Sequence, residues 1–424
     1  MYTQGLTSSA TFDALTNRVA SRTDANGNVI TTTYDALARQ ASISSPVASD
    51  PQPLVTYQYF LSSPATPTAH AVAHHFDVFH PGDTIDTAAF VDGIGRVVQT
   101  QNDASLFRGA GQAAETGVIV SGATIFDALG RPITQYNPTK STKPFGVYED
   151  SAPFDLVNDP HTDTVYDLWD LPNVITAPGN RVTNIAYEYG QINGSGPQLY
   201  MTTETAPNGR ATVTYTDMRD VVRAVKDVPA GAPSQQTLYD NDGMGQLLKA
   251  TDPTGFVTTH TYDQMGRRTS TSTPDGGLVE YGYDADGQQT SKVTPNLRAK
   301  NQQISYQYQL HRLTNVDYPG TADDVTYTYG AMGALDNGAG QVLRLEDGSQ
   351  IELNKYDPAG NIISQTSTMK LHAWTPTGDQ TKFTWTTQWQ YDGLGRLKSM
   401  VYPDSERLTY GYDAGGLVNF ISGD

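Results

Sequence analysis

Residues 262–284 read YDQMGRRTSTSTPDGGLVEYGYD, and residues 391–413 read YDGLGRLKSMVYPDSERLTYGYD. Aligned without a gap, the two stretches are identical at 11 of 23 positions, which chance does not produce. Looser copies, each marked by an aromatic residue followed by Asp, run from Phe12-Asp13 to Tyr412-Asp413, and their closest steps are 21 to 23 residues. Self-similarity at a fixed period is the signature of a repeat architecture, so the chain is predicted to be an array of short repeats.

One repeat has a local structure that its residues specify. Tyr-x-Tyr pairs such as Tyr281/Tyr283 place two rings on one face of a strand. The following Asp favours a turn because its carboxylate accepts N–H groups of nearby residues, and Gly three positions later supplies a left-handed backbone position. A return strand and a second turn, such as Thr273-Pro-Asp-Gly276, complete the unit. Each repeat is therefore predicted to be two short strands and two turns, with a bulged hairpin at the Asp turn.

The residues that define this pattern recur along the chain, which argues against a unique catalytic role for any of them. We expect Asp to form turns, Arg to make surface or inter-repeat hydrogen bonds, and Tyr to pack between strands. The repeat-motif residues with this structural role are Tyr34, Asp35, Asp92, Gly95, Arg96, Asp127, Gly130, Arg131, Tyr262, Asp263, Gly266, Arg267, Tyr283, Asp284, Tyr391, Asp392, Gly395, Arg396, Tyr412 and Asp413.

The fold class follows from the same pattern. No segment shows a sustained apolar period of 3.6 residues, while Thr and Val fill the expected strands, so the protein is predicted to be all-β with little helix. A unit of about 22 residues cannot bury its own face and must stack on its neighbours. Residues 1–424 are interpreted as one array, degenerate with insertions over 1–165 and more regular over 166–424. Insertions are expected at 101–123, 140–163 and 331–340. Periodicity alone leaves open a spiralling sheet or a propeller.

Composition excludes several classes of protein. The 424 residues contain 45 Asp and Glu against 27 Lys and Arg, and this acidic balance argues against binding to a nucleic-acid backbone. No apolar run of about 18 residues is present, so no membrane span is expected. The absence of cysteine removes disulfides and thiolate chemistry. The excess of Tyr over Phe, 25 against 12, fits half-buried sheet surfaces.

Two weaker patterns suggest chemistry. The turns that begin at Asp24, Asp240 and Asp284 resemble calcium loops, but their Gly falls at position 4 instead of 6, so no metal or other cofactor is predicted. His74 and His80 are an even number of residues apart and would share a face if both lay on one strand. A half-buried structural cluster is the simpler interpretation of these histidines.

The motif Tyr-Asp-x-x-Gly-Arg, with Pro-Asp-Gly near the far turn, resembles the YD repeat of RHS proteins. That family includes bacterial polymorphic toxins, the B and C components of insecticidal toxin complexes, and teneurins. The resemblance is densest over 239–330 and 356–413 and is degenerate over 36–90 and 135–165. It implies a β-sheet ribbon that spirals into a hollow shell around a C-terminal effector. The sequence stops at Asp424, one return strand after Tyr412-Asp413, without the family's closing Asp-Pro-x-Gly element at that end. A segment of a larger protein is therefore expected, and no self-cleavage residues are assigned.

The resemblance implies a non-enzymatic shell segment of a secreted or cell-surface bacterial toxin. Its partners would be the rest of its own shell and the enclosed effector. An alternative is a module that binds carbohydrate at a cell surface, which predicts exposed Tyr pairs or Trp374, Trp385 and Trp389. A third hypothesis is a propeller hydrolase with His74 and His80 in its site.

Overall fold

The computed structural model describes residues 5–47, 53–63, 68–106, 115–149, 159–320, 323–372 and 380–424. The chain divides into two compact units. Unit 1 comprises residues 1–123, 138–155 and 320–424, and unit 2 comprises residues 124–137 and 156–319. Two of the expected insertions, 101–123 and 140–163, fall in part outside the described residues.

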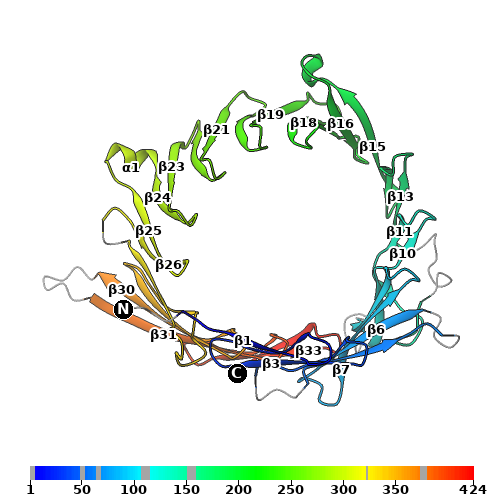
Figure 1. Ribbon diagram of the computed structural model, residues 1–424, viewed down its shortest axis with the longest axis vertical. Coiled ribbons are helices and arrows are strands. Elements are labelled where there is room, and N and C mark those ends of the chain that lie inside the picture. The colour runs from blue at the N-terminus through cyan, green and yellow to red at the C-terminus, as the bar shows by residue number, and fades with distance from the viewer. Residues whose placement is uncertain are drawn as a thin grey trace. The chain divides into compact units, whose positions relative to one another are not determined.

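Unit 1 contains two sets of antiparallel strands whose neighbours follow chain order (Figure 1). The first set is β1 (Ser9–Phe12), β2 (Val19–Thr23), β3 (Val29–Tyr34), β4 (Gln40–Ile43), β5 (Val55–Phe60), β6 (Ala69–Phe76), β7 (Thr84–Val91), β8 (Val97–Leu106), β9 (Glu115–Ser121) and β12 (Thr139–Lys140). The second set is β27 (Val325–Tyr329), β28 (Val342–Glu346), β29 (Gln350–Tyr356), β30 (Ile362–His372), β31 (Gln380–Tyr391), β32 (Leu397–Val401), β33 (Arg407–Tyr412) and β34 (Val418–Gly423).

Unit 2 is a run of antiparallel strands, again in chain order. They are β10 (Thr124–Phe126), β11 (Pro132–Tyr136), β13 (His161–Tyr166), β14 (Pro172–Ala177), β15 (Arg181–Gly190), β16 (Leu199–Thr205), β17 (Ala211–Thr216), β18 (Val222–Val228), β19 (Gln235–Asn241), β20 (Leu247–Thr251), β21 (Val257–Tyr262), β22 (Arg268–Thr273), β23 (Gly277–Tyr283), β24 (Gln289–Val293), β25 (Ile304–Gln309) and β26 (Arg312–Asp317). The predicted all-β array of hairpins is confirmed.

Helix is scarce among the described residues, as the sequence predicts. The two helical segments are α1 (Pro295–Ala299) and the 3₁₀ turn η1 (Ile192–Gly194). The side chain of Thr294 caps α1 by accepting the N–H of Leu297, and Pro295 occupies the first turn, where its missing N–H costs nothing. Both segments replace hairpin turns and leave the strand order unchanged.

The cores are small, since few side chains of the described residues are fully buried. In unit 1, Val72, Ala88 and Phe90 pack together under Phe145 and Tyr148. In unit 2, the corresponding cluster is Leu199, Tyr215 and Ala224, with Ile192, Met201 and Val213 packed around it. Most strand residues are only half-buried, so burial of apolar surface is spread thinly and the contacts between successive repeats carry much of the order.

Candidate functional site

The repeated turn is a compact hydrogen-bonded unit around one carboxylate. In the turn that begins at Asp263, Oδ1 accepts the N–H groups of Met265 and Arg267 at 2.9 and 3.0 Å, and Oδ2 accepts Nε of Arg267 at 2.7 Å. Backbone bonds from Asp263 N–H to Arg267 and from Gly266 N–H to Asp263 close the loop. The same arrangement is formed by Asp35 with Arg39, Asp92 with Arg96, Asp127 with Arg131, and Asp392 with Arg396.

The glycine of this turn adopts a left-handed backbone. Its φ is +82° at Gly266, and Gly95, Gly130 and Gly395 have values of +86°, +84° and +77°. A side chain is strained in this region, which accounts for the preference for Gly. Ala38 occupies the equivalent place after Asp35 and still has a φ of +61°, so that repeat keeps the turn at some cost in free energy.

A β-bulge lies beside each of these turns. Strand register shifts between Thr261 and Tyr262 and between Gln390 and Tyr391, directly before the Asp. The extra residue lets the strand bend where the hairpin closes.

Hydrogen bonding favours the ionised form of the carboxylates of Asp263 and Asp127. The backbone N–H of Arg267 is the main cause that lowers the pKa of Asp263, and that of Arg131 lowers the pKa of Asp127 in the same way. The carboxylate of Asp127 in turn raises the pKa of the Arg131 guanidinium. These groups are therefore a fixed ion pair with no proton to transfer near neutral pH.

Tyrosine joins each turn to the next repeat. The hydroxyl of Tyr283 donates to the carbonyl of Arg268 at 2.8 Å, while the guanidinium of Arg267 lies 4.9 Å from the Tyr283 ring centre and donates to the carbonyl of Asp284. Equivalent hydroxyl-to-carbonyl bonds run from Tyr34 to Val19, from Tyr262 to Leu247 and from Tyr412 to Leu397. Tyr rather than Phe is needed at these positions because the ring packs and the hydroxyl bonds.

The other motif residues vary this pattern. Asp284 accepts the backbone N–H and side-chain amide of Gln288, which stands where other repeats have Arg. Asp413 accepts the N–H groups of Gly415 and Leu417. Tyr391 is half-buried, and this burial raises the pKa of its hydroxyl.

One repeat turn makes a second set of contacts, with the first strand set of unit 1. Arg396 donates to Asp77 at 2.7 Å, and the two side chains are only 12% and 2% exposed. The Arg396 guanidinium also lies over the rings of Phe79 and Tyr412, at 5.0 and 4.8 Å. Nδ1–H of His80 donates to the other oxygen of Asp77, at 2.7 Å. We call Asp77, Phe79, Arg396 and Tyr412 the inter-strand-set junction, or junction.

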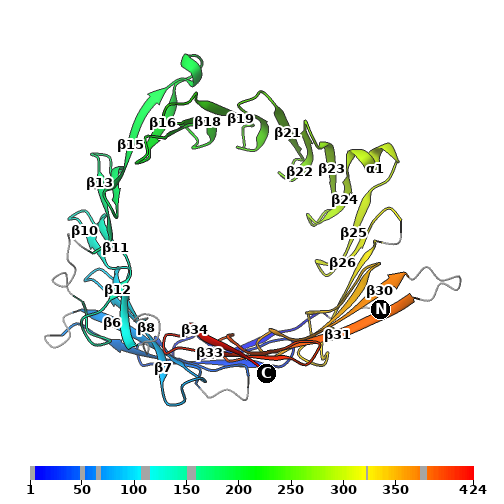
Figure 2. The ribbon, with the colours of Figure 1, turned by 180° about the vertical axis from the view of Figure 1, so that it is seen from behind.

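The junction extends to the last turn of the chain, which lies against β7 and β8 (Figure 2). A Cβ on Gly415 would come within 2.7 Å of the carbonyl oxygen of Asp103, and one on Gly416 within 3.1 Å of Ile85. Burial, together with the charge of Asp86, raises the pKa of Asp103 to about 6 although the Asp86 N–H donates to it. This side of the junction therefore carries a titratable carboxyl.

A third contact in unit 1 uses glutamine side chains as if they were backbone. The amide of Gln99 donates to the carbonyl of Glu149 and accepts its N–H, at 2.8 and 3.0 Å. Gln101 pairs in the same way with Val147 and Gly146. Both glutamines are fully buried, and they hold residues 141–149 across β8 over the Phe90 core.

The two histidines do not lie on one strand. β6 ends at Phe76, so His74 is a strand residue and His80 lies in the following turn. His74 pairs with Asp86 at 2.8 Å, and His80 pairs with Asp77. Nε2 of His74 is buried and has no hydrogen-bond partner among the described residues, so none of them is a nucleophile bonded to this nitrogen.

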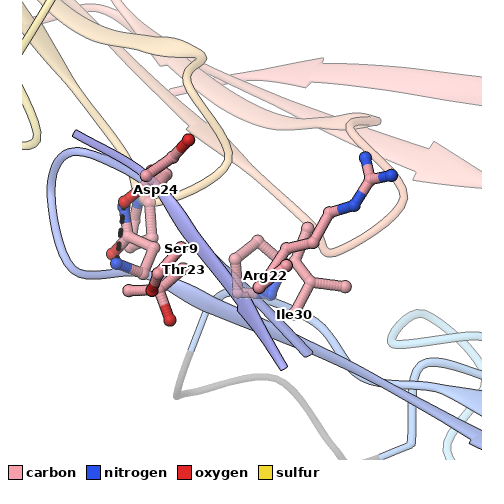
Figure 3. A pocket seen from close by; sticks show the side chains of 10 residues that line it. Ser9, Arg22, Thr23, Asp24 and Ile30 are labelled. Atoms are coloured by element: carbon pink, nitrogen blue, oxygen red, sulfur yellow. Dashed lines mark hydrogen bonds between the residues drawn. The ribbon is translucent and has the colours of Figure 1, made fainter. Parts of the chain in front are cut away.

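The carboxylate of the first calcium-like turn is used within the protein. Asp24 accepts the N–H groups of Asn26 and Asn28, and the Asn26 side chain accepts the N–H of Ala339 at 2.7 Å. Figure 3 shows the adjoining pocket of about 460 Å³, where Arg22 extends away from Asp24. Over the described ranges, no three His, Asp or Glu side chains are grouped to hold a metal ion.

A larger groove of about 630 Å³ lies over β29–β33, and Trp389 and Tyr391 line it. Trp385 and Trp389 are half-buried, while Trp374 lies outside the described residues. In the described part of the chain, no helix is long and apolar enough to cross a membrane.

The repeat pattern is matched by the RHS repeat family model over residues 242–278 and 391–419, which contain the densest turn motifs. These two stretches carry RHS repeats. In them, the RHS repeat is the unit whose Asp, Arg and Tyr contacts are described above. No curated protein matches the sequence.

Solved structures share the fold of this chain. A crystal structure of TcdB2-TccC3 superposes with a TM-score of 0.80 at 18% identity, covering 99% of this chain and 24% of that one. The Photorhabdus luminescens Tc holotoxin pore gives 0.80 and 18%, covering 99% and 26%. This chain therefore spans about a quarter of the length of those chains.

The repeat pattern in the sequence marks the turn residues and gives no sign of the contacts that are not repeated. Asp77, Gln99, Gln101 and Glu149 carry no repeat signature, and their partners lie far along the chain. The spacing of Gln99 and Gln101, two residues apart and so on one face of a strand, is the one signal that could have pointed to them.

Proposed function

We propose that this chain is a non-enzymatic wall segment of a shell in a secreted, toxin-complex-type protein. In this proposal the wall belongs to a longer chain and encloses an effector segment. The observation that carries it is the match of 99% of the chain to TcdB2-TccC3 at a TM-score of 0.80. A wall needs continuous sheet with no gap between repeats, and the Tyr-to-carbonyl bonds supply one such tie between successive hairpins.

The side chains support a structural role. The Asp and Arg of each turn bond to one another and to the backbone, so their reactive atoms are already occupied. The mechanism of such a wall is confinement: it excludes proteases and separates an enclosed chain from its target until release.

The test is cryo-EM of the complete protein to which this chain belongs, combined with limited proteolysis. We expect density for a second segment enclosed by the wall, and cleavage of that segment only after the wall is opened by denaturant. A solid domain without a lumen, or an effector that is cleaved as fast as a free one, would contradict the proposal.

A second function, carbohydrate binding, is favoured by one observation. The residues that line the groove over β29–β33 include the aromatic Trp389 and Tyr391 as well as Gln388 and Ser364. Aromatic faces and hydrogen-bonding side chains together suit sugar rings. A glycan array probed with the complete protein tests this function, and an array without any bound glycan would remove it.

A further inference from the structure

His74, Asp86 and Asp103 form a row at one end of three neighbouring strands of unit 1, and we call them the acidic row. His74 faces Asp86 in the ladder of β6 and β7, and Nδ1–H of His74 donates to Asp86 Oδ1 at 2.8 Å. The backbone N–H of Asp86 donates to Asp103 Oδ2 at 2.8 Å, directly beyond the last residue pair of the β7–β8 ladder. Like charges on adjacent strands destabilise a sheet, so a proton on one of the two carboxyl groups stabilises the row.

Asp103 is the carboxyl group of the row with the fewer partners. Asp86 Oδ1 also accepts the hydroxyl of Thr84 at 2.6 Å, whereas the carboxylate of Asp103 accepts only the N–H of Asp86 within the described residues. Burial, with the negative charges of Asp86 and Asp83, raises the pKa of Asp103 to about 6, and His74 offsets only part of this rise. In mildly acidic solution Asp103 is therefore the group that holds the proton.

The turn between β33 and β34, residues 413–417, packs on the same end of the strands. A Cβ on Gly415 would lie 2.7 Å from the carbonyl oxygen of Asp103 and 3.0 Å from the Cα of Ala104, so the turn backbone lies directly against β8. Gly416 lies in the same way against the side chain of Ile85 on β7. The contact leaves no space for a side chain or a water molecule between the turn and β8.

The elements packed around Asp103 bring no cation that could stabilise its ionised form. On β9, the residue that faces Asp103 is the uncharged Val118. The turn contributes Asp413, whose carboxylate accepts two N–H groups of its own turn. Arg396 of the preceding motif turn is already bonded to two other aspartates. Loss of the proton from Asp103 therefore adds an uncompensated negative charge to this contact.

We propose that the β33–β34 turn is a proton-dependent clasp on β7 and β8, closed while Asp103 holds a proton and loosened when Asp103 ionises. An ionised carboxylate gains by contact with water, and the turn must move away to admit it. Because the closed contact raises the pKa of Asp103 from 3.8 to about 6, opening becomes easier as pH rises between these values and changes little above them. The clasp concerns the fold of unit 1 and does not depend on an enclosed effector.

The first test displaces the turn and follows the proton. Gly415→Ala forces the turn away from β8, so the Asp103 carboxyl should titrate at least about one pH unit lower than in wild type. Carboxyl NMR of protein labelled in its aspartate side chains measures this, and Asp103→Asn identifies the resonance. Gly243→Ala, where a Cβ has no atom within 4 Å, is the matched control and should leave the titration unchanged. An unshifted Asp103 in Gly415→Ala would show that the sheet alone buries it and would overturn the clasp.

The second test measures the opening itself by amide hydrogen exchange. In wild type, the hairpin over residues 407–423, corrected for the intrinsic exchange rate, should be about tenfold less protected at about pH 8 than at about pH 5. In Asp103→Asn, which carries no charge at either pH, protection should stay at the higher value. The hairpin over residues 277–293 of unit 2 is the internal control. An equal loss of protection in wild type and Asp103→Asn, or in the control hairpin, would also overturn the proposal. Thermal melting of each variant verifies that the fold is retained.

Discussion

The turns that begin at Asp263 and Asp392 have the same motif and different surroundings. In unit 2, Arg267 bonds to its own turn and covers Tyr283 of the next repeat. In unit 1, Arg396 makes the same contacts with Asp392 and Tyr412 and also pairs with Asp77, 319 residues away. The same five-residue motif is thus a local link in one place and a long-range contact in the other.

The difference shows how a repeat acquires a special role without a new sequence. Nothing in the 391–396 stretch departs from the repeat pattern; the change is in the partner, Asp77. Arg396 is buried between two carboxylates, whereas Arg267 is partly exposed and pairs with one. Loss of one partner should therefore destabilise the fold more at Arg396, because an uncompensated buried charge is costly.

The largest effect is expected from Asp77→Ala. Removing this carboxylate leaves Arg396 buried with one partner, so unit 1 should lose about 3–5 kcal/mol of unfolding free energy. Urea unfolding of wild type and variant measures it. Asp227→Ala removes the partner of the exposed Arg210 and should cost at most about 1 kcal/mol. Equal losses of unfolding free energy in Asp77→Ala and Asp227→Ala would show that the junction contributes no more stability than an exposed ion pair.

Gly415→Ala should be the next most harmful change. Its Cβ would lie 2.7 Å from the Asp103 carbonyl oxygen and 3.0 Å from the Ala104 Cα, both backbone atoms that cannot move freely. Overpacking of this kind costs about 1–3 kcal/mol. In unit 2, a Cβ on Gly243 would have no atom within 4 Å, so Gly243→Ala should be nearly neutral in stability. Thermal melting of the two variants checks the contrast, and identical melting temperatures would refute the close approach.

Asp103→Asn should stabilise unit 1 only above mildly acidic pH. Burial raises the folded-state pKa of Asp103 to about 6 from 3.8, so its ionisation costs stability as pH rises through 6. The group is partly solvated, and with solvent screening the gain at pH 8 should be roughly 1 kcal/mol. At pH 4 the variant and wild type should be equal. The urea midpoints of wild type and variant at pH 4 and pH 8 measure this difference in stability. A larger stabilisation of the variant at pH 4 than at pH 8 would contradict the prediction.

The smallest effect is expected at the turn that lacks its glycine. Ala38→Gly relieves a backbone φ of +61°, and the added freedom of the unfolded chain offsets part of the gain, so stability should rise by about 0.5 kcal/mol. Gly95→Ala places a side chain at a φ of +86° and should lower stability by about 1 kcal/mol. Changes of the same sign in both variants would contradict this account.

The repeated part of the fold could be predicted from sequence because its causes are local. Asp263, Gly266 and Arg267 lie within five residues, so turn geometry and bulge follow from the residue types alone. The hydroxyl bond of Tyr283 spans one repeat and follows once the period is known. The sequence does not show that Arg396 makes a long-range contact while Arg267 makes only local ones. Asp77 and Arg396 are 319 residues apart, and a single sequence carries no signal of their pairing.

The groove was only half predictable. Trp389 stands out by residue type, but Lys398 and Arg407 come to line the same groove as Lys355 only through strand register. Register depends on bulges and turn lengths that shift by single residues, and each shift moves a side chain to the other face.

The glutamine pairs on β8 have a consequence for how unit 1 can change over time. Because Gln99 and Gln101 stand in for a neighbouring strand, residues 141–149 are attached through side chains and could detach while every strand ladder stays intact. The amide protons of Gly146 and Glu149 should then exchange with solvent through a local opening, well before the sheet itself opens. Deamidation of Gln99 or Gln101 would replace the side-chain NH₂ group, which donates to a carbonyl, with a carboxylate oxygen, which can only accept. That single change would release residues 141–149 without any cut in the chain.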